Sequence, residues 1–258
     1  MLTSSLLSSL QSVRHGFFTR QGGVSQSYFQ SLNFTLTKGD TYENVKKNRD
    51  IAMTAFQTTS ENLVCMKQVH GTETLFIDYP TGFLTPNQRM LEGDALVTTT
   101  SGLAIGILTA DCVPILLSDS TETIIGAAHA GWRGALGGVV ESVLGIMREK
   151  GAKNIVAAIG PCIRQHNYEV GLDVWEGVIT KNPNNQAFFE KTNVSGKYLL
   201  DLPGLVKNIL MCQGVSQVDL LSHDTYSDEA MFFSCRRATH RKEPTFGCQL
   251  SAIMIQKE

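Results

Sequence analysis

Two kinds of hydrophobic pattern alternate along the chain. Residues 102–108 and 123–128 are short, nearly continuous apolar runs, which are typical of strands buried on both faces. The second run leads through a Gly-Trp-Arg-Gly turn into a segment with helical spacing of apolar residues, which predicts a helix terminated by Gly151. The apolar positions of that helix are Leu136, Val139, Val140, Val143, Leu144 and Met147.

Two further helices and four more strands are predicted in the same way. A helix is expected over residues 42–56, and another begins near Asp201, an N-cap followed by Pro203, and stops at Gly214. The inward positions predicted for the first of them are Val45, Ile51, Ala52 and Phe56. Strands are predicted over 63–66, 154–159, 218–221 and 248–255. Polar and apolar residues alternate in the last strand, which favours a half-buried, antiparallel strand.

These elements predict a single α/β domain with a mixed sheet. No Pro/Gly/Ser linker, repeat or low-complexity tract divides the chain, so residues 1–258 are expected to form one domain, with residues 1–14 as an N-terminal extension. The chain has 258 residues, of which 42% are hydrophobic, and this length is sufficient to bury a substantial core.

Composition excludes several classes of function. The formal net charge of −2 gives no global basic field, which argues against nucleic-acid binding. No stretch is long enough to span a membrane, and the N-terminus has no basic residue before Arg14, unlike a secretory signal. The six cysteines form no Cys-X-X-Cys pair and are interpreted as reduced thiols. We therefore expect a cytoplasmic protein that binds neither nucleic acid nor membrane.

Three residues with metal-binding side chains lie at the ends of apolar runs. These are His70, Cys112 and His129, and one thiol with two imidazoles is a ligand set suited to Zn²⁺ or Cu²⁺. The first two residues are 42 positions apart and the last two are 17 apart, so only the fold can bring them together. From spacing alone the alternatives remain open, because a free cysteine is commonly a small buried hydrophobe and a histidine commonly a hydrogen-bonded structural residue.

Ten short segments occur in the order that is found in one bacterial family. They are residues 15–25, 31–33, 48–49, 68–71, 94–98, 109–114, 129–134, 159–163, 168–171 and 232–237. Together they resemble the YfiH family, which is described both as polyphenol oxidases or laccase-domain proteins and as purine nucleoside phosphorylases. The resemblance implies a layered α-β-β-α arrangement and a single catalytic domain. It also implies zinc held by His70, Cys112 and His129, and purine nucleosides and phosphate as substrates.

Phosphorolysis of a nucleoside needs cationic side chains, because the nucleophile is an anion. The substrate-binding candidates are Arg49, Gln68, Arg133 and Arg236. Arg133 is the first choice, since it stands at the predicted start of a helix. An arginine can instead pair with a carboxylate, and for Arg236 or Arg237 this alternative has equal weight. Asp111 is a candidate proton carrier or orienting residue beside Cys112, with a backbone-bonded aspartate as the alternative.

A metal ion explains a second reaction more directly, because it activates water for attack on C6 of adenine. The resemblance therefore implies adenosine deaminase activity beside the phosphorylase activity, which involves adenosine, inosine and methylthioadenosine. Other classes remain open. The chain has no His-X-His pairs of the kind that multicopper sites require, so a copper-dependent polyphenol oxidase would hold a single metal. A cysteine hydrolase would use Cys112 with His129, and a cell-wall editing or partner-binding factor would be non-catalytic.

The chain departs from many relatives in one region. They carry a cysteine shortly before the Phe-Phe-Ser motif, whereas this chain has Ser-His-Asp-Thr-Tyr at residues 222–226. Residues 238–244 are also unusual. His223 is either a polar contact at the rim of the site or an exposed histidine, and the departure affects the expected substrate preference rather than the three ligands.

Overall fold

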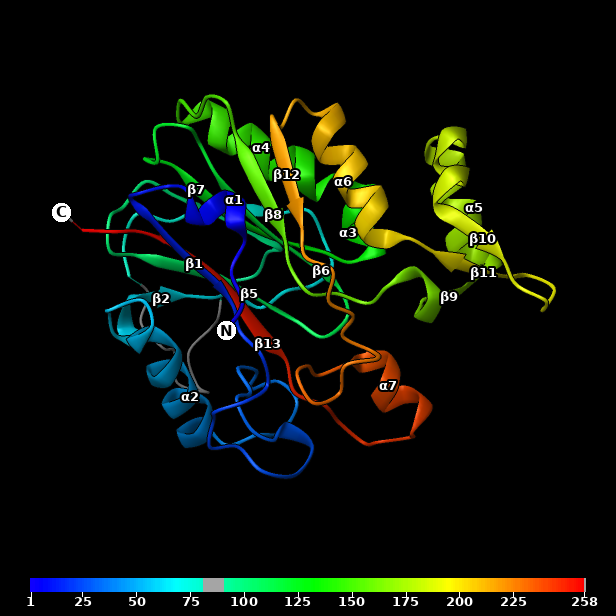
Figure 1. Ribbon diagram of the computed structural model, residues 1–258, viewed down its shortest axis with the longest axis horizontal. Coiled ribbons are helices and arrows are strands. Elements are labelled where there is room, and N and C mark those ends of the chain that lie inside the picture. The colour runs from blue at the N-terminus through cyan, green and yellow to red at the C-terminus, as the bar shows by residue number, and fades with distance from the viewer. Residues whose placement is uncertain (81–90, 258) are drawn as a thin grey trace.

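The computed structural model describes residues 1–80 and 91–257, and two stacked β-sheets form its centre (Figure 1). In sheet order, the four-stranded sheet consists of β1 (Val13–Phe17), β13 (Gln249–Ile255), β5 (Ala104–Thr109) and β2 (Leu63–Val64). The six-stranded sheet consists of β12 (Gln217–Leu220), β8 (Val156–Ile159), β6 (Val113–Ser118), β7 (Ile125–Ala130), β4 (Ala95–Thr98) and β3 (Thr74–Phe76). Both sheets mix parallel and antiparallel pairs.

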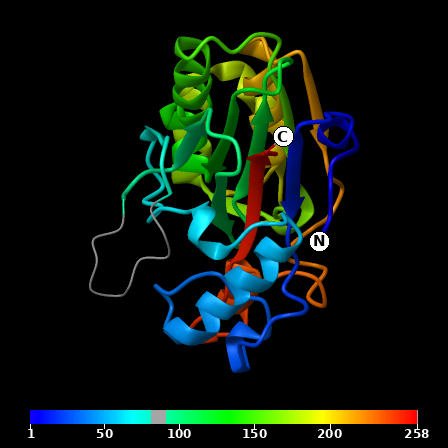
Figure 2. The same cartoon turned by 90° about the vertical axis from the view of Figure 1, so that its left-hand side faces the viewer.

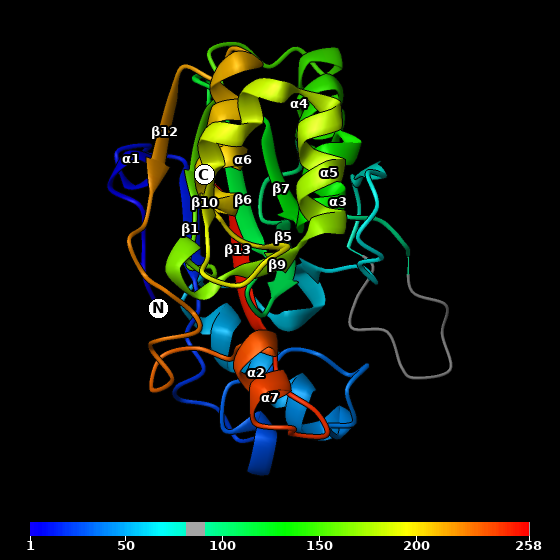
Figure 3. The same cartoon turned by 90° about the vertical axis from the view of Figure 1, so that its right-hand side faces the viewer.

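Helices cover the outer faces of both sheets. The helices α4 (Val139–Glu149) and α6 (Leu202–Cys212) pack on the six-stranded sheet, and α2 (Tyr42–Thr54) packs on the four-stranded sheet. A third group of buried side chains, which includes Phe17, Ile105 and Leu116, fills the space between the sheets. Figure 3 shows α4 and α6 at one end of the molecule and α2 at the other. The layers therefore follow the order α-β-β-α, which confirms the expected fold.

Smaller elements decorate these layers. A three-stranded sheet contains β10 (Phe189–Lys191), β11 (Lys197–Leu200) and β9 (Glu169–Gly171), in that order. It lies beside α5 (Leu172–Lys181) at the right-hand edge of Figure 1. The short helices are α1 (Ser5–Ser8), α3 (Trp132–Gly137) and α7 (Cys235–His240). Short 3₁₀ helices occur at η1 (Ser27–Phe29), η2 (Ser60–Asn62), η3 (Gln165–Asn167) and η4 (Pro183–Phe188).

Most of the predicted elements are confirmed, and their caps are found where the sequence placed them. Asp201 caps α6 by accepting a hydrogen bond from the Gly204 amide at 3.0 Å, and Gly151 follows α4 with a φ of +100°. The predicted helix after residue 131 is divided into α3 and α4, because Gly138 adopts a φ of +108° between them.

Two predictions about burial are wrong. The antiparallel strand β13 is buried on both faces and not half-buried. It lies between β1 and β5 in its sheet, with α2 covering one face and the six-stranded sheet covering the other (Figure 2). Ile51 does not face inward, since 37% of it is exposed, and Met53 takes the buried position on α2 instead. Helical periodicity alone does not specify which side of a short amphipathic stripe meets the sheet.

Within the described residues, no helix is both long and apolar enough to cross a membrane. The N-terminal segment packs on the sheets, since Leu7 is fully buried in the core between them. In this segment the backbone N–H of Ser4 donates to Nε2 of the buried His15 at 2.8 Å, so the imidazole must be neutral.

Acid is expected to destabilise the protein partly through His15. Burial lowers the pKa of His15 from 6.5 to about 4, against the opposing charge of Asp219. As the pH falls, the unfolded chain therefore binds the proton before the folded protein does. The stability that neutral His15 contributes is complete above pH 6.5, and it decreases by about 3 kcal/mol at most as the pH falls toward 4. Chemical denaturation of His15→Gln and of the unmodified protein between pH 7 and pH 4 measures it. A variant with the same pH slope as the unmodified protein would contradict the assignment.

Candidate metal centre and substrate cavity

A cavity of about 480 Å³ lies at the junction of the two sheets, within the size range of small-molecule sites. Its lining comes from segments that are distant in the chain, among them the loop before α2, the loop after β2, the β5–β6 turn, the end of β7, the residue after η3, helix α7 and the loop before β13. The predicted site residues in this lining are Arg49, Gln68, His70, Asp111, Cys112, His129 and Arg236. Arg133 is not among the lining residues.

The three predicted metal ligands converge at one end of this lining. The ligand atoms of His70, Cys112 and His129 all lie within 4.8 Å of one another. Sγ of Cys112 is 3.9 Å from Nε2 of His70, and the two imidazole rings meet edge to face with centroids 4.8 Å apart. His129 is buried, Cys112 is half-buried and His70 is exposed. The group of ligands therefore extends from the buried His129 to the accessible His70, and all three residues line the cavity.

The connection between the sheets explains this convergence. β5 belongs to the four-stranded sheet and β6 to the six-stranded sheet, so the turn at residues 110–112 crosses from one to the other and carries Cys112. His129 lies opposite Pro114 on the neighbouring β7, immediately beside this crossing. His70 is not at the end of a strand as predicted, because β2 stops at Val64. It lies in a loop and has a φ of +59°.

Asp94, at the start of β4, holds two of the three ligands. Its Oδ1 lies 2.8 Å from Nδ1 of His129 and accepts from the amide of His70, while Oδ2 accepts from the amides of Val69 and Gly71. Burial acts to raise the pKa of Asp94, but these hydrogen bonds lower it below its usual value, so the carboxylate is ionised. An ionised partner at Nδ1 leaves Nε2 of His129 as the ligand atom. Asp94 is not among the site residues predicted from the sequence, although it lies in one of the ten segments that carry the family resemblance.

The donor set fits a metal ion. Tetrahedral zinc would place a thiolate sulfur and an imidazole nitrogen about 3.5 Å apart, slightly closer than the observed 3.9 Å. Burial and the charge of Asp111 raise the pKa of the Cys112 thiol. Burial and the charge of His129 lower the pKa of the His70 imidazole. The imidazole is therefore neutral, as a ligand must be, and the thiol needs a bound cation to become a thiolate. Gly131 keeps this space open, since a Cβ there would lie 3.0 Å from the His70 ring and 3.3 Å from Sγ of Cys112.

Asp111 has structural partners on two elements. With a φ of +90°, it accepts from the hydroxyls of Thr225 at 2.7 Å and Ser234 at 2.9 Å and from the Arg236 amide at 2.6 Å. Burial raises the pKa of its carboxyl, and these hydrogen bonds oppose that shift. Asp111 therefore connects the β5–β6 turn to the start of α7. This agrees with the alternative prediction of an aspartate bonded to backbone, and the structure adds the hydroxyls of Thr225 and Ser234 as partners.

Arg49 and Gln68 are also engaged with the protein. Arg49, buried on α2, donates through Nη2 to the Leu63 carbonyl at 2.8 Å. Gln68 uses both ends of its amide on Leu108, donating to its carbonyl and accepting from its N–H, each at 2.7 Å. Both side chains line the cavity. Arg49 joins α2 to β2, and Gln68 fastens the loop that carries His70 to β5. Their substrate-binding roles stay predictions.

The remaining arginines differ in position. Arg236 lines the cavity, donates through Nη1 to the Glu169 carbonyl at 2.8 Å, and has its guanidinium 5.3 Å from the Tyr168 ring centroid. Arg133 is exposed, and its guanidinium stacks 4.4 Å from the Trp132 ring centroid. The helix that starts there has only six residues, which removes the helix-start argument for Arg133. Arg237 is buried on three backbone carbonyls instead of pairing with a carboxylate.

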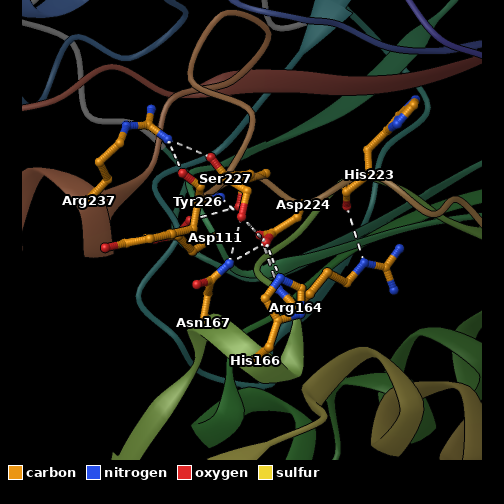
Figure 4. Close-up of polar contacts among 10 residues, drawn as sticks. Asp111, Arg164, His166, Asn167, His223, Asp224, Tyr226, Ser227 and Arg237 are labelled. Atoms are coloured by element: carbon orange, nitrogen blue, oxygen red, sulfur yellow. Dashed lines mark hydrogen bonds and ion pairs between the residues drawn. The ribbon is translucent and has the colours of Figure 1, made fainter.

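The unusual segment at residues 222–226 forms a polar cluster with residues of η3 and α7 (Figure 4). Asp224 accepts from Asn167 at 2.5 Å, from the hydroxyl of Ser227 at 2.9 Å, and from backbone amides, and it pairs with His166 at 3.1 Å. His223 contributes its backbone carbonyl to Arg164, while its half-buried ring points away from the cluster and packs against Phe232. His223 does not line the cavity. The segment therefore braces the wall that carries Tyr168.

The fold and the site together define a class of protein: a layered α-β-β-α domain with one thiol and two imidazoles grouped in its cavity. The chain belongs to the family described as multi-copper polyphenol oxidoreductase laccase, whose family model matches residues 14–256. It is 32% identical to a purine nucleoside phosphorylase of Rickettsia conorii over 245 residues, which cover 92% of this chain and all of that protein. It is also 36% identical to a purine nucleoside phosphorylase of Bacteroides thetaiotaomicron, covering 100% and 97% of the two chains.

Relatives named YfiH and solved structures agree with this assignment. The chain is 35% identical to the purine nucleoside phosphorylase YfiH of Escherichia coli, covering 85% of this chain and 86% of that protein. The crystal structure of YlmD from Geobacillus stearothermophilus aligns with a TM-score of 0.86 and 30% identity, covering 95% and 93% of the two chains. A Neisseria meningitidis crystal structure aligns with a TM-score of 0.83 and 33% identity over 95% of each chain. The resemblance to the YfiH family is thereby confirmed.

Proposed function

We propose that this protein is a zinc-dependent purine nucleoside phosphorylase that acts on adenosine, inosine and methylthioadenosine with phosphate, and that it also deaminates adenosine. The observation that carries the proposal is the convergence of His70, Cys112 and His129 on a cavity with basic side chains in its lining. The names of the relatives support the phosphorylase activity. Small-molecule nucleosides and phosphate are the corresponding partners, and the family description makes copper the alternative metal.

His70, Cys112 and His129 would hold the zinc ion, with Asp94 fixing His129 and the loop of His70. When bound, zinc supplies a Lewis acid that polarises a substrate oxygen or activates water, which is the chemistry that deamination requires. Two imidazoles and one thiolate would supply the three protein ligands that catalytic zinc sites use, which would leave a position for water or substrate.

The chain's own residues would support phosphorolysis by binding and orientation. In this reaction the bond from C1′ of the ribose to the purine nitrogen breaks, a bond from C1′ to a phosphate oxygen forms, and the leaving purine takes a proton. Arg49 and Arg236 are the phosphate-binding candidates in the cavity lining, and the contacts of Arg236 with Glu169 and Tyr168 fix its orientation in advance. The rings of Phe34, Tyr168 and Phe246 provide apolar lining for a purine base. Asp111 acts as a positioning residue, because its oxygens hold the start of α7.

Phosphate dependence is the expected result that tests the proposed reaction. Zinc-loaded protein is incubated with adenosine, inosine or methylthioadenosine, with and without phosphate, and the products are separated by chromatography. We expect base release to require phosphate and to yield the corresponding sugar 1-phosphate, while deamination of adenosine proceeds without phosphate. Equal base release in phosphate-free buffer would instead identify a hydrolase. Absence of inosine from the phosphate-free adenosine reaction would contradict the deaminase activity.

One observation favours a second candidate function, a cysteine hydrolase. Asp94 orients His129 next to Cys112, as the third member of a catalytic triad orients its base. The raised pKa of the Cys112 thiol argues against it, because a nucleophilic cysteine needs a lowered pKa. Modification by iodoacetamide separates the two: metal-loaded protein is expected to protect Cys112, whereas a hydrolase would be alkylated at Cys112 and inactivated.

A further inference from the structure

Lys38 is a cation that lines the cavity and is not among the substrate-binding residues predicted from the sequence. It belongs to the loop between Phe34 and α2, and its ammonium lies 4.0 Å from the Phe246 ring centroid. The loop is held at Lys38 itself and at Asp40, two residues further along the chain. The Thr245 hydroxyl donates to the Lys38 carbonyl at 2.7 Å, and Asp40 accepts from side chains that include Ser25 at 2.6 Å and Asn33 at 2.9 Å. The loop therefore holds the Lys38 stem while the charged end remains exposed.

The Lys38 ammonium has no carboxylate partner among the described residues, because no ion pair within 4.0 Å includes it. Lys67, which lines the same cavity, differs in this respect, since its ammonium lies 2.8 Å from Glu92. Among the described lining residues the one carboxylate is Asp111, which is buried and already accepts three hydrogen bonds. The cavity consequently carries excess positive charge, although the chain as a whole has a net charge of −2.

Lys38 and Arg236 line the same cavity from different elements, the loop before α2 and helix α7. The Lys38 ammonium lies over the ring of Phe246 and the Arg236 guanidinium over the ring of Tyr168, and both rings also line this cavity. The cavity therefore receives two cationic side chains from segments that are distant in the chain.

We propose that Lys38 and Arg236 together bind a phosphate group of the ligand, with Lys38 capturing the anion and Arg236 orienting it. Arg236 is held by Glu169 and Tyr168 and presents a fixed planar donor, whereas the flexible ammonium of Lys38 supplies a movable point charge. The phosphate group belongs either to free phosphate, the co-substrate in the proposed function on which this inference rests, or to the 5′-position of a nucleotide.

Binding measurements on zinc-loaded protein test this site without turnover. Lys38→Met keeps a side chain that packs on Phe246 and removes the charge, so the Kd for inorganic phosphate, from ³¹P line broadening, is expected to rise about tenfold. Lys38→Arg is expected to stay within about threefold of the unmodified protein. Lys67→Met is the matched control, and its phosphate Kd should change by less than about twofold because Lys67 is already paired with Glu92.

A second arm with adenosine 5′-monophosphate distinguishes the two sources of the phosphate group. A Kd that rises for inorganic phosphate assigns the site to free phosphate. A Kd that rises for the nucleotide alone, with adenosine affinity unchanged, assigns it to a nucleotide phosphate. Unchanged Kd values for both anions in folded Lys38→Met would overturn the proposal. If base release proves independent of phosphate, the proposed function fails, and these titrations still decide the role of Lys38.

Discussion

Cys112→Ala is expected to purify as a folded protein that has lost its metal ion and its activity. Two imidazoles bind zinc much more weakly than two imidazoles and a thiolate, so metal content should fall from about one ion per chain to less than about 0.1. Both phosphorolysis and deamination should fall by at least about 100-fold. Plasma mass spectrometry measures zinc and copper together and so identifies the metal, and thermal unfolding of metal-stripped proteins compares the folds.

Cys248→Ala is the matched control for this experiment. Cys248 is another half-buried cysteine that lines the same cavity, but it does not belong to the group formed with His70 and His129. Its alanine variant should therefore retain about one metal ion per chain. Unchanged metal content in Cys112→Ala would refute the ligand assignment. If Cys112→Ala keeps its metal but no longer releases the base, Cys112 would instead be assigned as the nucleophile of a cysteine hydrolase.

Asp94→Asn is expected to weaken metal binding about 10- to 100-fold, the range seen when a partner of a metal-bound histidine is removed. Each carboxylate oxygen of Asp94 serves two donors, and together they orient His129 and the backbone of residues 69–71. An asparagine offers one oxygen in place of two, so it loses the two contacts of one carboxylate oxygen and turns an NH₂ group toward the N–H donors there. Competition with a chromophoric zinc chelator measures the metal affinity.

Asp119→Asn separates this effect from a general loss of stability. Asp119 is also a buried carboxylate that closes a loop, and it accepts from the amides of Thr121, Thr123 and Ile124 at 2.9–3.2 Å. Both variants should lower the stability of the protein by about 1–3 kcal/mol, since each disturbs buried hydrogen bonds. Only Asp94→Asn should release the metal. Equal metal affinity in the two variants would show that Asp94 has a purely structural role.

The elements with strong local signals were predictable from the sequence. Helix α6 has an aspartate N-cap, a proline in its first turn and a repeating apolar face, and each of these acts within a few residues. The strands β5, β7 and β8 are short apolar runs that are buried on both faces. The three ligand candidates were likewise chosen from their residue types and from matched segments around them, and the structure brings all three together.

Local signals could not predict partners that are far apart in the chain. Asp94 holds His129, which is 35 residues away, and Asp111 holds Ser234, which is 123 residues away. Arg133 had the right charge and a promising local position, yet the short α3 leaves it exposed outside the cavity lining. Lys38 does not belong to any recognisable sequence motif. Its position in the cavity lining depends on contacts of its loop with distant residues, such as the hydrogen bond from Thr245.

The sequence by itself determined six of the ten described strands in the two central sheets, the helices that cover them, the family and the chemical identity of the metal-binding donors. The tertiary structure decided which sheet each strand joins, and this choice creates the site. β5 and β6 are neighbours in the chain but belong to different sheets, so the turn between them carries Cys112 across the junction to His129 and His70. The same stacking buries both faces of β13. Periodicity and capping report interactions within a few residues, whereas sheet pairing, burial and hydrogen-bond partners depend on contacts between distant segments.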